Sequence, residues 1–466
     1  MTPQSAFMVV APIEPSREAA LRSLLASMNA APGRVNPANL LVPFAQFDAL
    51  HVARFLIIDD KTLGDVQVYG LTTPEYPRSL AFLGDVDGDS NEFLADAASR
   101  ADSGLRAIFS HCQDFTDATD LLAWMKAHSI SAAANYVNRR GRTVRRVRED
   151  AALREALERY LDEPEARDSV RPRELHRLLR QRAYDDVSKG RLTLSVEAPT
   201  PLAWTIRNAI HLVALPLVVL AIVAAIVVSA IAFLLPTVAA LVVIAGGAVI
   251  YLRRLEKTDA ELCSQVDDGH SNDLASIEDD DVTNQFSAMG SLKPGAFRLL
   301  ITSLVLVVID YAARHIYTRG RLARVRTIHF ARWVFLDRKR RVIFLSNYDG
   351  SLESYMDDFI NKVGFGLNVV FSNGIGYPRT SWLLKDGCAD ERKFKEYLRR
   401  HQMPTQVWYK AYPSLTAVDL ERNARLRSGL ESPSLSEREA QEWVSLLCEA
   451  RSISATSKVW SASATG

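Results

Sequence analysis

Two stretches of the chain carry the same pattern: LHVARFLII at residues 50–58 and IHFARWVFL at residues 328–336. Each places a histidine, an alanine and an arginine at the start of an apolar run with the length of a strand. A second shared pattern, Phe-Leu followed by Asp-Gly, stands at residues 82–88 and 344–350. The repeat predicts two related folding units, one on each side of a long apolar segment.

The register of the repeat supports this interpretation. Residues 80–112 align with residues 342–374 without a gap, and nine of the thirty-three positions are identical. Further matches, with small shifts of register, are Phe7 with Phe286, Pro15 with Pro294, His128 with His401, Tyr136 with Tyr409 and Thr143 with Thr416. We therefore expect two homologous units, each the size of a small domain.

The composition excludes some functions. The chain has 466 residues, with 56 basic and 55 acidic side chains, so its net charge predicts no nucleic-acid partner. The four cysteines stand far apart, which predicts reduced thiols and no metal site. The first residues lack a basic region followed by an apolar run, so we expect no signal peptide.

The apolar segment is long enough to cross a membrane twice. Residues 209–251 contain no acidic or basic side chain except His211, and as a helix they would extend about 65 Å, roughly twice the hydrocarbon thickness. Pro236 stands near the midpoint and predicts a turn there. Arg207 and residues 253–254 flank the segment, so we expect a two-span hairpin in the inner membrane with both termini cytoplasmic.

A shorter apolar run at residues 299–309 is about eleven residues long. That is too short to cross a bilayer, so we expect a buried or membrane-grazing helix, with a third span as the alternative. The acidic residues 267–281 predict an unfolded linker. The expected domains are residues 1–160 (first unit), 161–206 (basic helical connector), 207–254 (transmembrane hairpin), 255–283 (acidic disordered linker), 284–430 (second unit) and 431–466 (helix and disordered tail).

Each unit reads as strand, helix, two strands, helix and a last strand, with residues 105–110 as one of the expected strands. This order predicts an α+β fold of two tandem ferredoxin-like units closing into a pseudo-twofold barrel, with the hairpin inserted between them. The pattern resembles the dimeric α+β-barrel superfamily. Residues 328–350 and 405–412 are also similar to segments of uncharacterised bacterial membrane-anchored proteins. Both resemblances imply a fold and no activity.

The two His-x-Ala-Arg copies are the first candidate site. Side chains alternate along a strand, so His51 and Arg54 are expected on opposite faces, as are His329 and Arg332. If both arginines point into a shared cavity, they could hold a carboxylate or phosphate. The alternative is that each arginine pairs with a nearby acid and stabilises the fold.

The Asp-Gly pairs give a second candidate. Asp87-Gly88 and Asp349-Gly350 fit a turn between a strand and a helix. Residues 84–88, Gly-Asp-Val-Asp-Gly, are also similar to a motif of dye-decolourising haem peroxidases, which implies haem as a cofactor and Asp87 as a catalytic residue. The second copy lacks the first glycine, and neither His111, His128 nor His176 stands where an axial haem ligand is expected.

The expected function is binding near a membrane surface, with no assignable reaction. The ligand would be an apolar or anionic small molecule or a protein partner, and the bilayer itself is the expected lipid partner. The candidate binding residues are Arg54, Arg332, His51, His329, Asp349, Trp408 and Tyr409. Basic residues 145–148 and 171–182 are expected beside anionic headgroups. The alternatives are a haem-dependent peroxidase-like oxidoreductase and a non-catalytic membrane scaffold.

Overall fold

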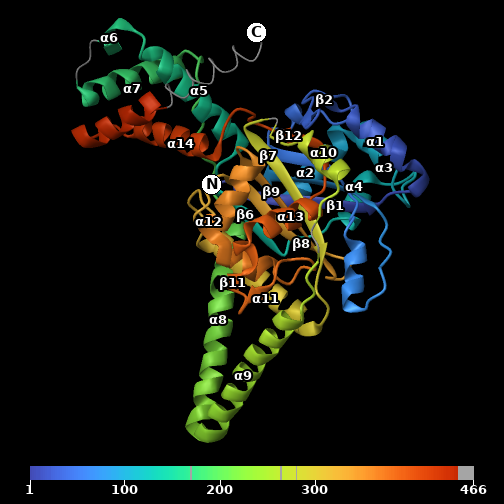
Figure 1. Cartoon of the computed structure of the whole chain (residues 1–466). Helices are drawn as coiled ribbons and strands as arrows, with labels where there is room; N and C mark the ends of the chain where they lie inside the picture. Colours follow the sequence, from blue (N-terminus) through green and yellow to red (C-terminus); the bar gives the residue numbers. More distant parts are fainter. Residues whose placement is uncertain (168–170, 263–264, 280, 450–466) are drawn as a thin grey trace.

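The computed structural model describes residues 1–167, 171–262, 265–279 and 281–449. The protein is α+β, with two four-stranded antiparallel sheets, a helical hairpin and a helical module (Figure 1). Sheet 1 has the order β1-β5-β4-β12 and sheet 2 has the order β7-β9-β8-β6, read in the same direction.

The strands of sheet 1 are β1 (Gln4–Pro12), β5 (Ser79–Asp87), β4 (Leu50–Ile58) and β12 (Thr405–Lys410). Those of sheet 2 are β7 (Thr283–Ser291), β9 (Arg341–Asp349), β8 (Ile328–Leu336) and β6 (Ala134–Val137). In each sheet, three strands come from one half of the chain and the edge strand comes from the other half. The strands described form two stacked sheets rather than one continuous ring.

The alternation of side chains along each strand buries both faces of both sheets. On β1, Met8 joins the apolar layer between the sheets, whereas Phe7 and Val9 pack toward helices. The layer between the sheets also includes Leu83 of β5 and Leu345 of β9, at corresponding places in the two sheets. This arrangement explains why every residue of β4 is buried.

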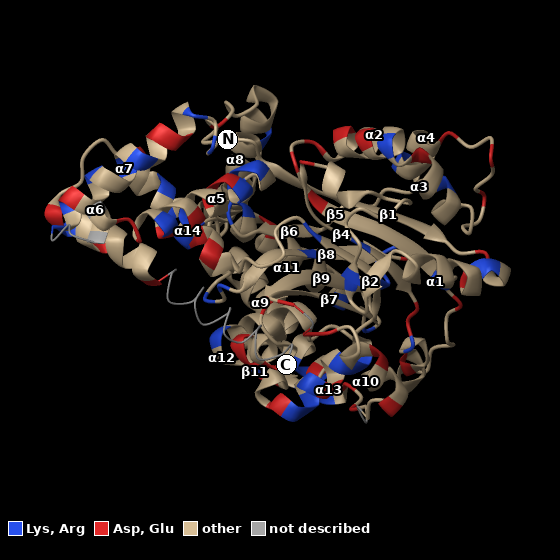
Figure 2. Cartoon of the chain, turned by 90° about the horizontal axis from the view of Figure 1, so that it is seen from above, with Lys and Arg blue, Asp and Glu red and all other residues tan. Residues whose placement is uncertain are grey.

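Helices cover the outer face of each sheet. Sheet 1 is covered by α1 (Glu18–Ala26), α2 (Ser90–Arg100), α3 (Asp102–Phe109) and α4 (Leu121–Ala127). Sheet 2 is covered by α11 (Ala296–His315), α12 (Leu352–Phe371) and α13 (Glu391–His401), with α10 (Asp268–Ala275) beside α13 (Figure 2). The expected strand at residues 105–110 is wrong, because residues 105–109 belong to α3, which ends at its C-cap Ser110 and places Leu105, Ile108 and Phe109 on one buried helix face.

Short elements complete the fold. They are η1 (Pro15–Arg17), β2 (Asn29–Ala31), β3 (Arg34–Val35), η2 (Phe44–Gln46), η3 (Leu63–Tyr69), β10 (Thr380–Ser381), β11 (Lys385–Asp386) and η4 (Gly387–Ala389).

The membrane-length segment forms α8 (Leu202–Ala232) and α9 (Leu234–Thr258), which project from the body as a hairpin (Figure 1). The chain breaks at Phe233, three residues before Pro236, so the proline lies in the first turn of α9, where its missing N–H costs no helical hydrogen bond. No residue of α8 is buried. By length and composition, α8, α9 and α11 could each cross a membrane.

Helix α11 packs against the body and lies across the base of the hairpin. Its first turn meets α9 through Phe297 and Tyr251, whose ring centroids are 5.1 Å apart. Near its other end, Tyr311 donates a hydrogen bond to the carbonyl of Leu212 in α8, at 3.2 Å. One face of α11 is buried on sheet 2, and the other exposes Leu300, Leu304, Val307 and Val308.

A helical module stands away from the hairpin, at the other end of the molecule (Figure 1). It comprises α5 (Val144–Tyr160), α6 (Pro164–Arg167), α7 (Pro172–Ser188), α14 (Ala417–Glu431) and a helical stretch at residues 437–449. The basic residues expected beside lipid headgroups lie in this module, far from the hairpin tip. Acidic side chains interleave with them on the same helices (Figure 2), as where Arg427 contacts both Glu149 and Asp150.

The acidic segment at residues 255–283 differs from the expected unfolded linker wherever the structure describes it. It contains the end of α9, helix α10 and the start of β7. Its carboxylates have basic partners: Glu278 pairs with Arg399, and Asp281 pairs with Lys410 at 2.6 Å. These contacts supply stabilisation that the composition alone does not indicate.

Candidate functional site

The two candidate arginines cross the space between the sheets in opposite directions. Arg54 extends from sheet 1 and donates to the carbonyls of Phe286 and Ser346, both at 3.0 Å. It also donates to the hydroxyl of Ser287 at 2.9 Å and to Oδ1 of Asn347 at 2.6 Å. Arg54 is 3% exposed, so these bonds satisfy its guanidinium in a place that water does not reach.

Arg332 makes the corresponding contacts from sheet 2 to sheet 1. It donates to the carbonyls of Phe7 (2.9 Å) and Gly84 (3.0 Å) and to Oδ2 of Asp85 (2.5 Å). In the alignment of the halves, these partners match Phe286, Ser346 and Asn347. Each arginine therefore crosses from its own sheet to equivalent positions of the opposite sheet.

One difference breaks this symmetry, because Asp85 is a carboxylate and its counterpart Asn347 is an amide. The buried layer thus holds two guanidinium groups and one carboxylate. Burial, together with the nearby charge of Arg332, lowers the pKa of Arg54 to about 9. Asp85 opposes that shift, since its negative charge favours both cations.

Each candidate histidine pairs with the aspartate of an Asp-Gly turn. Nε2 of His51 lies 3.0 Å from Asp87, and Nε2 of His329 lies 2.6 Å from Asp349. A β-bulge interrupts β4 between Leu50 and Val52, and His51 then contacts Phe330 of sheet 2. The expectation that His51 and Arg54 point to opposite faces is therefore wrong, because the bulge shifts the alternation.

The same two aspartates hold the starts of helices α5 and α14. Oδ2 of Asp87 accepts from the N–H of Val144 at 2.8 Å, and Oδ2 of Asp349 accepts from the N–H of Ala417 at 2.7 Å. A carboxylate at a helix N-terminus satisfies a free N–H and interacts favourably with the helix dipole. Asp87, the candidate catalytic residue, thus has the same structural contacts as its counterpart.

The aromatic candidates lie on opposite faces of β12. The indole of Trp408 packs between the sheets, with the guanidinium carbon of Arg54 5.0 Å from its ring centroid. Tyr409 points to the helical side and stacks on Phe44, with ring centroids 5.0 Å apart. Trp408 therefore lies with the arginines, and Tyr409 does not.

The space around Arg54, Arg332 and Trp408 has no room for a water molecule. A haem group does not fit this layer unless the sheets separate. The histidines considered as axial ligands bond to carbonyls instead: His111 to Ala107, His128 to Trp124 and His176 to Gly429, at 2.9–3.0 Å. Among the described residues, no group of three metal-ligating side chains comes together.

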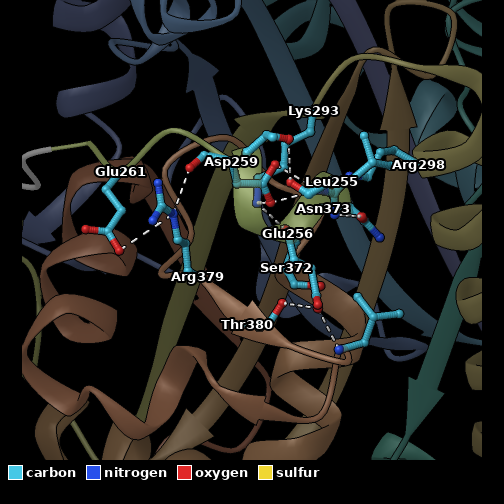
Figure 3. A network of polar contacts seen from close by, with 12 residues as sticks. Leu255, Glu256, Asp259, Glu261, Lys293, Arg298, Ser372, Asn373, Arg379 and Thr380 are labelled. Atoms are coloured by element: carbon cyan, nitrogen blue, oxygen red, sulfur yellow. Dashed lines mark hydrogen bonds and ion pairs between the residues drawn. The ribbon is translucent and has the colours of Figure 1, made fainter. Parts of the chain in front are cut away.

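A second polar cluster, which the sequence did not indicate, joins the end of α9 to the body (Figure 3). The buried carboxylate of Asp259 accepts from Lys293 at 2.7 Å and from Arg298 at 2.7 and 2.8 Å. Glu256, also buried, accepts from the hydroxyl of Thr380 at 3.0 Å and from the N–H of Leu383 at 2.8 Å. The hairpin is therefore fixed to the body by buried charged groups.

The sequence around these residues contains no pattern that clearly predicts this cluster. Arg298 stands at the start of an apolar run, and Lys293 stands in a Lys-Pro-Gly turn. Their acidic partner lies more than thirty residues earlier in a segment read as a linker. No local pattern connects these positions.

Comparison of the chain with protein-family models, with curated proteins and with solved structures gave no match.

Proposed function

We propose that the protein is a membrane-anchored binding scaffold whose α+β body stands on the cytoplasmic side of the inner membrane. One observation carries this proposal: α8 and α9 expose apolar side chains along their length, yet both ends of the hairpin return to the same body. A long exposed apolar surface is stable in lipid and unfavourable in water. We therefore infer that the hairpin inserts into the membrane and holds the body at its surface.

The placement of charge supports the orientation. Arg207 precedes the uncharged run and Arg253 and Arg254 follow it, whereas the turn around Phe233 has no charged residue. Basic residues are favoured on the cytoplasmic side of membrane spans. Both ends of the hairpin, and with them both termini of the chain, are therefore assigned to the cytoplasm.

The pairing of strands supports two spans rather than three. Strand β7 precedes α11 in the chain and β9 follows it, and the two strands pair along nine positions. If α11 crossed the membrane, β7 and β9 would lie on opposite sides and could not pair. In the proposed arrangement, α11 lies along the surface with Leu300 and Leu304 toward lipid.

The body itself is proposed to be two ferredoxin-like units that exchange their last strands. The identical strand orders, the reciprocal arginine contacts and the two His-Asp pairs support this assignment. The polar groups between the sheets bond to one another, which supports a structural role for them. The haem-dependent alternative predicts a Soret absorbance in the purified protein, and the scaffold predicts none.

Cysteine labelling tests the topology. In a Cys263→Ser variant, the exposed Cys448 is a reporter for the second half, because Cys112 and Cys388 are buried. Lys126→Cys adds an exposed reporter in the first half, and Leu235→Cys adds one at the hairpin tip. We expect a membrane-impermeant maleimide to label Cys448 and Lys126→Cys in inside-out vesicles and not in right-side-out vesicles.

The tip variant is the matched comparison. Leu235→Cys should react from the opposite face or remain protected within the bilayer. Labelling of the two body reporters from opposite faces would establish a third span instead. Labelling of the tip from the same face as Cys448 would show that the hairpin does not enter the membrane.

A further inference from the structure

An open cavity of about 810 Å³ lies where α8 leaves the body. Its wall is formed by the first turns of α8, the end of α11, the turn after β6, the start of β1 and the turn between β5 and α2. Cavities of several hundred Å³ are large enough to hold a small organic group. This one is separate from the filled layer between the sheets.

Three arginines from three different elements line the cavity: Arg140 after β6, Arg207 in α8 and Arg314 in α11. None of the three guanidinium groups has a hydrogen bond or ion pair with any residue that the structure describes. Burial, together with the positive charge of Arg314, lowers the pKa of Arg140 to about 10. The cavity wall therefore carries three cationic groups that form no ion pair with the acidic side chains lining the same cavity, Asp89 and Glu92.

The acidic groups nearby are held by other contacts or lie exposed, and none of them pairs with the three arginines. Asp89 lines the cavity, but its carboxylate accepts from the N–H of Asn91 at the start of α2, and Glu92 is exposed. Asp310, which partly offsets the repulsion at Arg140, pairs with His211 at 3.1 Å. It also accepts from the N–H of Asn135 at 3.2 Å.

Buried polar atoms without a partner gather at the same place. They are Nε of Arg140 and Nε of Arg314, which are donors, and Oδ1 of Asn135 and Oδ1 of Asn208, which are acceptors. Buried polar atoms are rarely left unpaired in folded proteins, so such a group calls for a bound partner. The partner that fits is an anion that also carries hydroxyl groups, because the guanidinium groups donate and the amide oxygens accept.

The cavity lies at the height expected for lipid headgroups. Arg207 is five residues before Leu212, where α11 meets α8, which corresponds to about 7–8 Å of helix. The headgroup layer on each side of a bilayer is about 5–7 Å thick. Trp204 also lines the cavity, and tryptophan is favoured at this boundary.

A neighbouring loop extends the positive surface. Arg319, Arg321, Arg324 and Arg326 follow α11, all four are exposed, and none has a partner among the described residues. The loop lies beside the turn after β6, since the N–H of Gly320 donates to the carbonyl of Asn138 at 2.9 Å.

We propose that this cavity binds the phosphodiester headgroup of an anionic glycerophospholipid with free hydroxyls, held by Arg140, Arg207 and Arg314. The guanidinium groups bind the phosphate, and the amides of Asn135 and Asn208 bind the headgroup hydroxyls. Basic pockets beside the cytoplasmic ends of membrane helices suit such headgroups. This inference rests on the proposed membrane anchoring and deepens it by naming the membrane component that is recognised.

The test uses the full chain purified in a neutral detergent, with phosphatidylglycerol as the probe and phosphatidylcholine as the comparison. Native mass spectrometry measures retained lipid, and a thermal unfolding scan against lipid concentration gives the apparent affinity. We expect retention and thermal protection with phosphatidylglycerol only. The double variant Arg140→Gln/Arg314→Gln should bind at least about ten-fold more weakly, because each charge-assisted hydrogen bond contributes at least that factor.

The matched control is Arg319→Gln/Arg321→Gln, which removes the same charge from the neighbouring loop and should retain most of the affinity. An equal loss of phosphatidylglycerol affinity in both double variants would overturn the cavity as the binding site and indicate diffuse attraction to a basic surface. Equal protection by glycerol 3-phosphate or inorganic phosphate would overturn the lipid as the source of the anion. If the double variant does not fold, Arg207→Gln, whose side chain is exposed and unpaired, provides the same comparison.

The outcome is separable from that of the topology test. If the native chain binds phosphatidylglycerol and phosphatidylcholine equally while its cysteine labelling is as expected, the headgroup site is rejected and the membrane anchor is retained. Altered labelling would reject the anchor itself.

Discussion

The single carboxylate between the sheets gives the sharpest prediction. In the Asp85→Asn variant, Arg54 and Arg332 remain buried without a counter-charge. Loss of one member of a buried ion pair typically costs about 3–5 kcal/mol. At about 2–4 °C per kcal/mol for a body of this size, we expect the thermal midpoint to fall by about 6–20 °C.

The swap variant Asp85→Asn/Asn347→Asp tests whether the two arginine positions are equivalent. It moves the carboxylate from residue 85, which contacts Arg332, to residue 347, which contacts Arg54. In the native chain, Arg54 already donates to Oδ1 of Asn347 at 2.6 Å. We expect most of the lost stability to return, and Asn347→Asp alone to be neutral or stabilising. The stability changes of substitutions within one polar network are commonly non-additive, so the swap can recover what the single substitution loses.

The assay is tryptophan fluorescence during thermal unfolding of the purified protein in detergent, with circular dichroism at low temperature to confirm the fold. Trp408 and Trp333 are both buried near the sheets and report on their separation. A shift of the Asp85→Asn midpoint by less than about 2 °C would show that Arg54 and Arg332 do not need this counter-charge. A swap variant as unstable as Asp85→Asn would show that the two arginine positions are not equivalent.

Three further predictions concern other parts of the molecule. Gly84→Ala should destabilise the protein by about 1–3 kcal/mol in urea unfolding, because a Cβ there would lie 2.4 Å from the carbonyl of Val52 and 2.7 Å from the ring of Phe7; an unchanged midpoint would contradict the close packing. Burial lowers the pKa of Lys293 to about 8, below that of an unfolded lysine, so the unfolded state binds more protons between these values and stability should rise with pH. Between pH 8 and 10, the free energy of unfolding should rise by roughly 2–3 kcal/mol less in Lys293→Met than in the native chain. Parallel pH profiles of the two proteins would contradict the lowered pKa of Lys293. Leu304→Asp should weaken the insertion of α11 into liposomes while leaving stability in detergent within about 0.5 kcal/mol, since this side chain is 56% exposed. Because α11 contains no tryptophan, Leu300→Trp supplies the reporter, and depth-dependent quenching of that tryptophan that Leu304→Asp leaves unchanged would place α11 away from lipid.

Several contacts of the candidate site could not be read from the sequence. The match of residues 80–112 with 342–374 placed Asp87 and Asp349 at equivalent turns, and the structure gives them equivalent histidine and helix contacts. The bulge at His51 was not foreseeable, because a bulge depends on the pairing partner and leaves no clear local signal. The partners of the two arginines were equally hidden, since they lie more than two hundred residues away.

Local sequence patterns were sufficient to predict several elements of the fold. Apolar runs predicted β4, β8 and the hairpin, because the period and length of a run of side chains decide which secondary structure buries them or places them in lipid. The closing strand expected at residues 406–411 likewise corresponds to β12.

The packing of the folded chain determines which distant groups come into contact. It exchanged β6 and β12 between the halves, directed both arginines into a filled layer, and brought Asp259 of a supposed linker onto Lys293 and Arg298. It also gathered three unpaired arginines at the base of the hairpin. Such meetings depend on the packing of distant surfaces and on the cost of burying charge without a partner, and neither is encoded in a local pattern.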